Sequence, residues 1–198
     1  SCFDSADPQS ESFAGQKDVY DMVGTTVLDN VFEGYNACLL AYGQTGSGKT
    51  FTMMGKLQGP DVGVIPRLCA HLFARIESVR ALRPCTFKVE ASYAEIYNER
   101  VKDLLKQASP EGLKVRMHPE FGTYVEGLTC KVVQSMESII KLIHKGNDRR
   151  STAATKMNDA SSRSHAIFTL NFTQVKIQAR GQEEVETKSI MSKIHLVD

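Results

Sequence analysis

The sequence lacks the features that mark membrane proteins and nucleic-acid-binding proteins. No apolar run approaches the roughly eighteen residues that a membrane-spanning helix requires, so no transmembrane segment is predicted. An excess of one charge is also missing, because 24 Lys and Arg residues face 23 Asp and Glu residues, a net charge of +1. Without a basic surplus there is no overall electrostatic case for binding nucleic acid or a membrane, and any partner must be recognised by a local patch.

Cysteine pairs and targeting signals are absent as well. The five cysteines are dispersed and odd in number, and none forms a C-x-x-C pair, which argues against a disulfide framework and against a zinc site. This usage predicts a reducing, intracellular setting. The start of the chain has no initiator Met and neither the basic nor the apolar region of a signal peptide, so we expect the chain to be a piece of a longer protein.

What is present fits one compact globular domain. A chain of 198 residues is long enough to bury about 70% of its unfolded surface around a single core. Its content of 41% hydrophobic and 24% charged residues is ordinary for soluble domains. No repeat, low-complexity segment or linker rich in Pro, Gly and Ser divides the sequence.

Apolar residues recur at helical spacing in three segments. The first runs from about residue 19 to Gly34, where a glycine is expected just after the last helical turn. The second covers residues 64–79, with Pro66 in the first turn, where its missing amide costs no hydrogen bond. The third begins after Ser135, a good N-cap, and is expected to end at Gly146.

Five segments are predicted as strands. The continuous apolar run "ACLLAY", residues 37–42, is too short for a helix and is typical of a strand buried on both faces of a parallel sheet. Alternating apolar and polar residues predict strands over 86–97 and 113–117, and apolar segments at 166–172 and 194–198 predict two more. Strands interleaved with helices indicate an α/β layered fold.

The stretch "GQTGSGKT", from Gly43 to Thr50, matches the phosphate-binding pattern G-x-x-x-x-G-K-[ST]. A predicted strand precedes it and a helix start follows it, which is the context in which backbone N–H groups converge on an anion. Lys49 would reach the β and γ phosphates of a nucleotide, and the Thr50 hydroxyl would ligate Mg²⁺. The alternative is an ordinary glycine-rich turn with a solvated lysine. The predicted nucleotide-binding residues are Gly43, Gln44, Thr45, Gly46, Ser47, Gly48, Lys49, Thr50 and Phe51.

Two further sites are weaker when judged from the residues alone. The polar cluster "NDASSRSH", residues 158–165, offers hydroxyls and a guanidinium that suit Mg²⁺ and γ-phosphate oxygens, although serine-rich loops before strands are mostly turns and caps. Asp198 follows the apolar strand "IHLV", at the place where P-loop enzymes carry an Asp for the metal. An Asp that merely ends a strand remains the alternative.

Taken in this order, the motifs resemble the motor domain of a kinesin, most closely of the kinesin-3 group. The resemblance implies an α/β, three-layer P-loop NTPase fold with a central, mostly parallel sheet between helices, in incomplete form. Residues 1–198 would be a partial motor domain with its phosphate loop at 43–50, its first switch at 158–165 and the start of its second switch at Asp198. The matching segments are "FEGYNACLLAYGQTGSGKTFTMMG", "GVIPRL", "SYAEIYNERVKDLL", "RRSTAATKMNDASSRSHAIF" and "IHLVD".

The family's roles are carried over residue by residue. Ser161 and Ser162 would contact the γ-phosphate and Mg²⁺, and Arg163 would pair with a glutamate of the second switch. Phe51 would stack on adenine, with a core position as the alternative. The implied catalytic residues are Lys49, Asn158, Ser161, Ser162 and Arg163, and the implied metal ligands are Thr50, Ser162 and Asp198.

The resemblance implies an ATPase that uses ATP, ADP and Mg²⁺ and moves along microtubules in the cytoplasm, as part of the cytoskeleton. A minor tubulin contact is expected near Arg116 and His118, with the main microtubule surfaces and the determinants of oligomeric state outside this chain. The family's second-switch continuation after Asp198 and its first strand are missing, so weak hydrolysis and an exposed, association-prone phosphate-loop strand are expected. The alternatives are a non-motor P-loop NTPase and a module that holds nucleotide, tubulin or cargo without a hydrolytic cycle.

Overall fold

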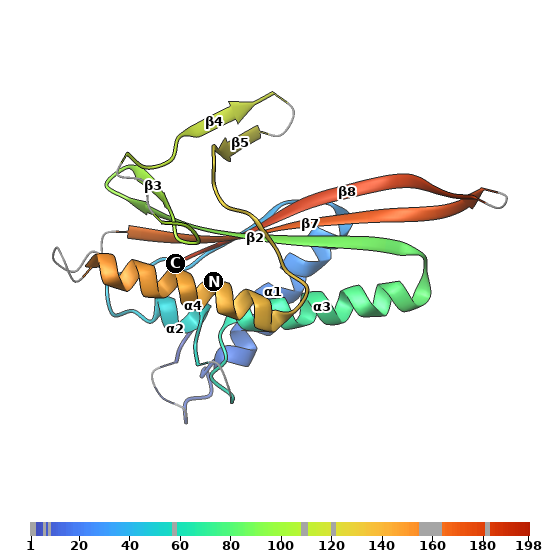
Figure 1. Ribbon diagram of the computed structural model, residues 1–198. Coiled ribbons are helices and arrows are strands. Elements are labelled where there is room, and N and C mark those ends of the chain that lie inside the picture. Colours follow the sequence, from blue (N-terminus) through green and yellow to red (C-terminus); the bar gives the residue numbers. More distant parts are fainter. Residues whose placement is uncertain are drawn as a thin grey trace.

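The computed structural model describes residues 3–5, 7, 9–56, 59–107, 111–119, 122–154, 164–180 and 183–198 (Figure 1). Helices and strands alternate along the chain, as the sequence predicts. In chain order the elements are α1 (Gln16–Glu33), β1 (Ala37–Leu40), α2 (Lys49–Met53), α3 (Val64–Leu82), β2 (Cys85–Tyr97), β3 (Arg100–Asp103), β4 (Val115–His118), β5 (Gly122–Val125), β6 (Lys131–Val132), α4 (Met136–Ala154), β7 (Ser164–Arg180) and β8 (Glu183–Val197).

The main sheet has the strand order β1-β8-β7-β2-β3, with β6 paired to β2, while β4 and β5 form a separate hairpin. The α/β class is confirmed, but the expectation of a mostly parallel sheet is wrong for the described strands. Among them β1 and β8 pair in parallel, whereas β8–β7, β7–β2, β2–β3 and β2–β6 are antiparallel. The reason is local connectivity: β7 is followed directly by β8, and β2 directly by β3, and consecutive strands joined by short turns pair antiparallel.

The strands β7 and β8 are longer than the two apolar segments that predicted them. The segment 166–172 lies inside the 17-residue strand β7, and the segment 194–198 overlaps only the end of the 15-residue strand β8. Between these segments the chain continues as one long antiparallel ladder with an irregularity at Lys176 and Ile177. The length of this arm was not predicted, because its residues are largely polar and form no apolar run.

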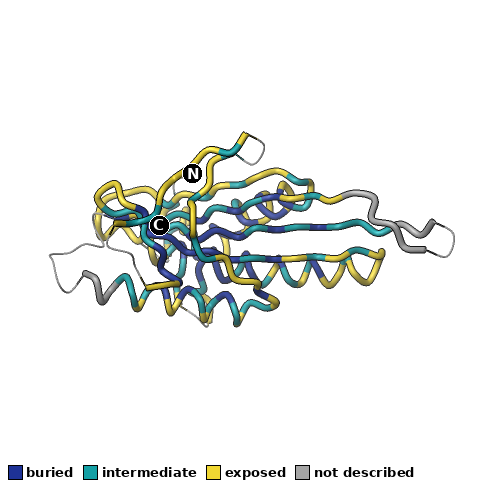
Figure 2. Tube along the Cα trace, turned by 45° about the horizontal axis from the view of Figure 1, so that its top comes forward, coloured by how far each residue is buried: buried dark blue, intermediate teal, exposed yellow. Residues whose placement is uncertain are grey.

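The described helices cover one face of the sheet. α3 lies between α1 and α4 and contacts both, and all three pack against strands of the main sheet (Figure 1). The described residues therefore form two of the three expected layers. The core lies between these layers, where buried residues of the sheet meet the inner faces of the helices (Figure 2). Its aromatic centre is formed by Phe32 of α1, Phe87 of β2 and Phe172 of β7, with ring centroids 4.8 to 6.3 Å apart. Within the described part of the chain, no helix is long and apolar enough to cross a bilayer.

Two glycines at predicted helix ends behave differently. Gly34 ends α1 as expected, in a left-handed conformation with φ of 101°, and its amide bonds to a carbonyl of the last turn. Gly146 does not end α4, which continues to Ala154. A β-carbon at position 146 would lie 2.2 Å from the Tyr93 ring, so this glycine gives the ring room to pack against the helix. Close packing rather than chain reversal explains this glycine.

Strand β1 is the edge of the sheet, not a strand buried on both faces. It pairs with β8 alone among the described strands, and its residues alternate between half-buried and exposed. Cys38 and Leu40 point away from the helices, and Leu40 is 58% exposed. An apolar edge strand with unpaired backbone groups is a template for pairing with another chain.

We expect residues 1–198 on their own to self-associate through β1. Replacing Leu40 with Lys should shift the population toward monomer, because a charge on an edge strand opposes strand addition. Light scattering after size-exclusion chromatography measures this shift. The matched control is Met22→Lys, because Met22 is an apolar residue of similar exposure, 59%, that lies on helix α1 and not on the edge strand. Equal behaviour of the two variants, or a monomeric unmodified chain, would contradict the edge mechanism.

Candidate functional site

The predicted phosphate loop joins β1 to α2, in the expected strand-loop-helix arrangement. Gly48 is the N-cap of α2 with φ of 85°, and Gly46 has φ of 83°. A β-carbon at either position would meet no atom within 4 Å, so the space around these residues would allow a side chain. It is the left-handed backbone that requires glycine here.

The Lys49 side chain lies over the loop to which it belongs. Its Nζ donates hydrogen bonds to the carbonyl oxygens of Gly43, at 2.9 Å, and Gln44, at 2.8 Å. The amine therefore stays next to the loop backbone, and neutral carbonyls are its partners there. A phosphate oxygen is a stronger partner for an ammonium group than a carbonyl, because both members of that pair are charged. Lys49 is thus placed to release these two carbonyls and to bind an anion instead.

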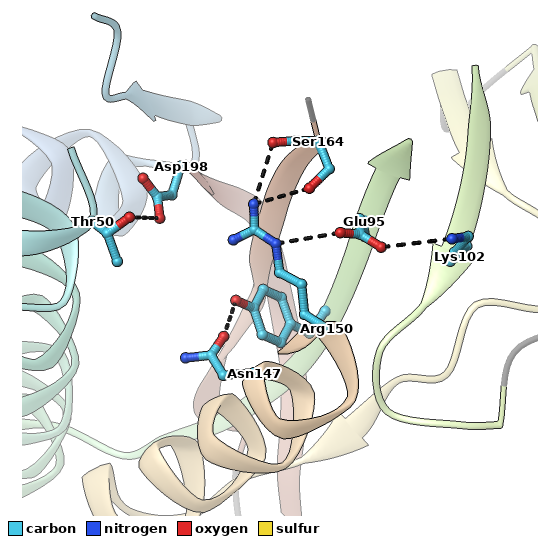
Figure 3. A network of polar contacts seen from close by, with 8 residues as sticks. Thr50, Glu95, Lys102, Asn147, Arg150, Ser164 and Asp198 are labelled. Carbon is cyan, nitrogen blue, oxygen red and sulfur yellow. Dashed lines mark hydrogen bonds and ion pairs between the residues drawn. The ribbon is translucent and has the colours of Figure 1, made fainter. Parts of the chain in front are cut away.

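Thr50 and Asp198 meet although 148 positions separate them in the sequence. The Thr50 hydroxyl donates to the Asp198 carboxylate at 2.7 Å (Figure 3). The parallel register of β1 and β8 explains this contact, since both strands end at the same side of the sheet and their following residues become neighbours. A hydroxyl and a carboxylate are hard oxygen ligands of the kind that Mg²⁺ prefers, so this pair fits the predicted metal site.

The described residues contain no group of three or more His, Cys, Asp or Glu side chains that could hold a metal by themselves. A metal at Thr50 and Asp198 would therefore depend on further oxygens. Mg²⁺ usually keeps several waters and is shared between one or two carboxylates and the phosphates of a substrate. The ligand set favours a metal that arrives with a nucleotide over a permanently bound one.

A buried ionic network lies next to this pair and was not predicted (Figure 3). Arg150 of α4 donates through Nε to Glu95 of β2 at 3.3 Å, and its Nη2 donates to the Ser164 hydroxyl at 3.1 Å and the Ser164 carbonyl at 3.2 Å. The second oxygen of Glu95 lies 4.0 Å from Lys102 Nζ. Glu95 is only 5% exposed, so its charge depends on these two cations.

The sequence does contain a signal for Glu95. Phe87, Val89, Ala91 and Tyr93 alternate along β2 as the residues that face the core, and Glu95 is the next position with the same parity. A carboxylate at a position where the pattern predicts burial requires a cationic partner inside the fold. The pattern could not say which Arg or Lys fills that role, because the partner is 55 positions away.

A cavity of about 260 Å³ connects the ionic network with the Thr50–Asp198 pair. Thr50, Asp198 and Arg150 line it together with Asn147 and with apolar core residues. The Tyr93 hydroxyl enters the same space and donates to Asn147 Oδ1 at 2.7 Å. Burial raises the pKa of Tyr93 to about 12, so this hydroxyl stays protonated at neutral pH. The predicted metal ligands and the unpredicted network thus surround one partly polar space.

The predicted switch residues Asn158, Ser161, Ser162 and Arg163 lie outside the described residues. The elements on either side of their segment are described: α4 ends at Ala154 and β7 begins at Ser164. Ser164, the first residue after the segment, is held by Arg150. Ser164 therefore lies next to Arg150, one of the residues that line the cavity, and the roles of the four predicted switch residues stay predictions.

Phe51 is the third residue of α2, and it is not in the core. It is 50% exposed, as a side chain that stacks on a ligand at the surface would be. The alternative of a core position is therefore wrong. Its backbone carbonyl accepts a hydrogen bond from the buried Gln16 side chain at 2.6 Å.

The β4–β5 hairpin carries the residues for which a filament contact is expected. It projects on the side of the sheet opposite the helices (Figure 1). Met117 is 77% exposed, and Tyr124 is also exposed. Arg116 forms an ion pair with Glu126 at 3.1 Å, which reduces the net positive charge that this hairpin offers. Apolar and aromatic exposure is thus at least as prominent as basic charge.

Comparisons with known proteins all point to one family. A family model described as the kinesin motor domain matches residues 2–198. Kinesin-like protein KIF16B of Mus musculus is 50% identical over 198 residues, which are 99% of this chain and 15% of that protein. Kinesin-like protein Klp98A of Drosophila melanogaster is 51% identical over 197 residues, again 99% and 15% of the two proteins.

Solved structures agree with the sequence comparison. KIF14 with ADP in complex with a microtubule matches with a TM-score of 0.85 and 45% identity, over 99% of this chain and 55% of that one. A KIF14 dimer with AMP-PNP on a microtubule matches with a TM-score of 0.84 and 45% identity, over 99% and 54% of the two chains. The chain thus spans about half of these solved chains and a much smaller part of the curated relatives.

Proposed function

Because the chain belongs to the kinesin motor-domain family, we propose that its parent protein binds Mg-ATP at residues 43–50 and couples ATP hydrolysis to movement along microtubules. Microtubule complexes of a similar motor domain with ADP and AMP-PNP support this proposal. A cytoplasmic location on the microtubule cytoskeleton follows from the same activity. Residues 1–198 would contribute the phosphate loop, the first switch at 158–165 and the start of the second switch at Asp198.

The observation that carries the proposal is the contact between Thr50 and Asp198 at the end of two parallel strands. A glycine-rich turn alone would not need an acidic strand end at hydrogen-bond distance from its Thr hydroxyl. In a nucleotide site both groups have a role, since each would hold the Mg²⁺ that accompanies the phosphates. When bound, Mg²⁺ would neutralise part of the charge on the β and γ phosphate oxygens.

Each predicted site residue would make a different contact with the nucleotide or the metal. Lys49 would exchange the Gly43 and Gln44 carbonyls for the β and γ phosphates. Ser162 would join Thr50 and Asp198 around the metal. Three further residues come from the same switch segment: Asn158 and Ser161 would lie at the γ-phosphate, and Arg163 would pair with a glutamate that follows Asp198 in the family.

Arg150 would position the switch segment without touching the nucleotide. It binds both the hydroxyl and the carbonyl of Ser164, the residue at which the segment enters β7. Glu95 in turn accepts a hydrogen bond from Arg150, and Tyr93 donates one to Asn147 on the same helix. Movement requires two switch arrangements that differ by contacts to one phosphate, and a shift from 1:99 to 99:1 requires about 5.5 kcal/mol of differential binding. A few charge-assisted hydrogen bonds, each worth roughly 1.5–3 kcal/mol, supply that amount.

Two finer points belong to the proposal. Residues 1–198 alone should hydrolyse ATP at least about a hundredfold more slowly than the parent motor, since the loss of one preorganised donor already costs that much. The β4–β5 hairpin would add a minor tubulin contact near Arg116 and His118, in which the exposed Met117 side chain takes part.

Co-sedimentation of the full-length parent with microtubules tests the proposed function. We expect tight binding with a non-hydrolysable ATP analogue and release with ADP, together with ATP hydrolysis that microtubules accelerate. ATP hydrolysis without acceleration would identify a non-motor NTPase. Binding to microtubules that is the same in every nucleotide state would identify a module without a hydrolytic cycle. Either result would overturn the motor assignment.

A further inference from the structure

Gln16 is a buried polar residue whose role neither the motifs nor the metal site explains. It is the first residue of α1, and only 7% of it is exposed. Its Nε2 donates to the backbone carbonyl of Phe51 at 2.6 Å, across 35 positions of sequence. A carbonyl can only accept, so the amide group must present its NH₂ to α2. The bond links the start of α1 to the helix that carries Lys49 and Thr50.

The Phe51 carbonyl has lost the partner that a longer helix would give it. In a continuing helix the amide of Gly55 would bond to it. In this structure the Gly55 amide lies 3.4 Å from the Thr50 carbonyl instead, and the Thr50 carbonyl also accepts from the Met54 amide at 2.8 Å. The chain turns away at Gly55, whose φ is 61°. The side chain of Gln16 therefore satisfies a carbonyl that the early end of α2 leaves open.

Other hydrogen bonds fix the position of α1. Its first turn is capped by the Asp18 carboxylate, which accepts from the Gly15 amide at 2.9 Å. One turn further along the same face, the Tyr20 hydroxyl is hydrogen-bonded to His71 of α3 at 2.9 Å. Gln16 and Tyr20 thus fasten α1 to two different helices. Only the Gln16 contact reaches the five-residue helix α2.

We propose that Gln16 is a positioning residue that holds α2, and with it Lys49, Thr50 and the Phe51 ring, in place for nucleotide binding. The inference rests on the proposed function and extends it to a residue outside the phosphate loop. A helix of five residues has few internal hydrogen bonds, so its position depends on contacts at its ends. A displacement of α2 moves the phosphate contacts and the exposed Phe51 ring together, because all three residues are consecutive.

The test compares two variants of the full-length parent by titration with a fluorescent ATP analogue. Gln16→Met keeps the shape and removes the donor, and Gln16→Glu adds a negative charge against the Phe51 carbonyl. We expect nucleotide affinity to fall about three- to tenfold in Gln16→Met, the range that one hydrogen bond covers, and further in Gln16→Glu. In steady state KM for ATP should rise while kcat changes less than about twofold, since bound nucleotide itself orders α2.

The matched control is Tyr20→Phe. It removes a hydrogen bond from the same face of α1, but from the contact with α3. We expect it to lower the melting temperature and to leave KM for ATP unchanged. A merely structural Gln16 would behave in the same way, and unchanged nucleotide affinity in both Gln16 variants would overturn the inference. If the unmodified protein itself bound no nucleotide, the proposed function would fall as well, which separates the two failures.

One measurement needs no substitution. In the unmodified protein, nucleotide binding should slow amide hydrogen exchange in residues 49–55 and also in the first turn of α1, because Gln16 couples the two. Protection of residues 49–55 with no change in α1 would overturn the inference even where both Gln16 variants fail to fold.

Discussion

Replacing Lys49 with Ala is expected to weaken Mg-ATP binding by about a hundredfold and to reduce ATP hydrolysis by at least the same factor. Lys49 would make two charge-assisted hydrogen bonds to phosphate oxygens, each worth roughly 1.5–3 kcal/mol, and about 2.7 kcal/mol corresponds to a factor of a hundred. Nothing else on α2 carries a positive charge that could replace it, since its remaining residues are Thr50, Phe51, Thr52 and Met53.

Stability should change little in this variant. Lys49 is half-buried, but the hydrogen bonds of its amine lie at the surface, and its described partners are carbonyls of its own loop. Substitutions that touch neither the core nor a buried polar network usually change the free energy of unfolding by less than about 0.5 kcal/mol. Loss of binding in Lys49→Ala would therefore report on the phosphate contact and not on folding.

Lys56→Ala is the matched control. Lys56 is an exposed lysine near α2, and its partner is Asp61 at 2.7 Å, away from the phosphate loop. Calorimetric titration with Mg-ATP should show normal affinity for this variant and a loss in Lys49→Ala. Co-sedimentation adds a second readout, because Lys49→Ala should still bind microtubules but no longer respond to ATP. Equal ATP affinity in both variants would show that residues 43–50 are only a glycine-rich turn.

Much of the site could be predicted because its determinants are local in sequence. The apolar run before Gly43, the glycines of the loop and the helix after Gly48 are all set by neighbouring residues, and each lies where the pattern puts it. The placement of Asp198 at the end of a strand could also be predicted, since an apolar segment followed by an Asp is a local signal. What the sequence could not state is that β1 and β8 are neighbours in parallel register, which brings Thr50 to Asp198.

The wrong predictions concern features that local apolar patterns do not reveal. Gly146 looked like a helix end, because the glycine itself does not reveal that the Tyr93 ring packs against it. The resemblance implied a mostly parallel sheet, and the polar residues between two apolar segments concealed the long antiparallel β7–β8 ladder. Glu95 is an intermediate case, since its parity on β2 predicts burial while its partner Arg150 is set by tertiary packing.

The Glu95–Arg150 pair should carry the largest stability effect in the described structure outside the apolar core. Both side chains are largely buried, with 6% and 16% of their surface exposed. Replacing Arg150 with Met should lower the free energy of unfolding by about 3 kcal/mol, because among the described residues Glu95 keeps only the Lys102 amine at 4.0 Å as a cationic partner. For a domain of this size the melting temperature should fall by about 6–12 °C.

A double-mutant cycle separates the ion pair from simple loss of packing. Glu95→Gln alone should cost less, about 1 kcal/mol, since Arg150 keeps its two bonds to Ser164 and some access to water. The double variant Glu95→Gln with Arg150→Met should be more stable than the sum of the single effects predicts, by at least about 1 kcal/mol. Additive effects would mean that the two side chains do not interact across β2 and α4.

The exposed pair Lys17–Asp21 on α1 is the matched control for burial. Its side chains are 72% and 48% exposed, so Lys17→Met should leave the free energy of unfolding essentially unchanged. Urea unfolding of all four variants measures these values under one condition.

Arg150→Met should also weaken nucleotide binding in molecules that remain folded. The reason is that Arg150 holds Ser164, the residue at which the segment 155–163 enters β7. If Arg150→Met unfolded more easily but bound nucleotide normally, Arg150 would support the fold alone, and the ionic network would have no part in holding the switch segment.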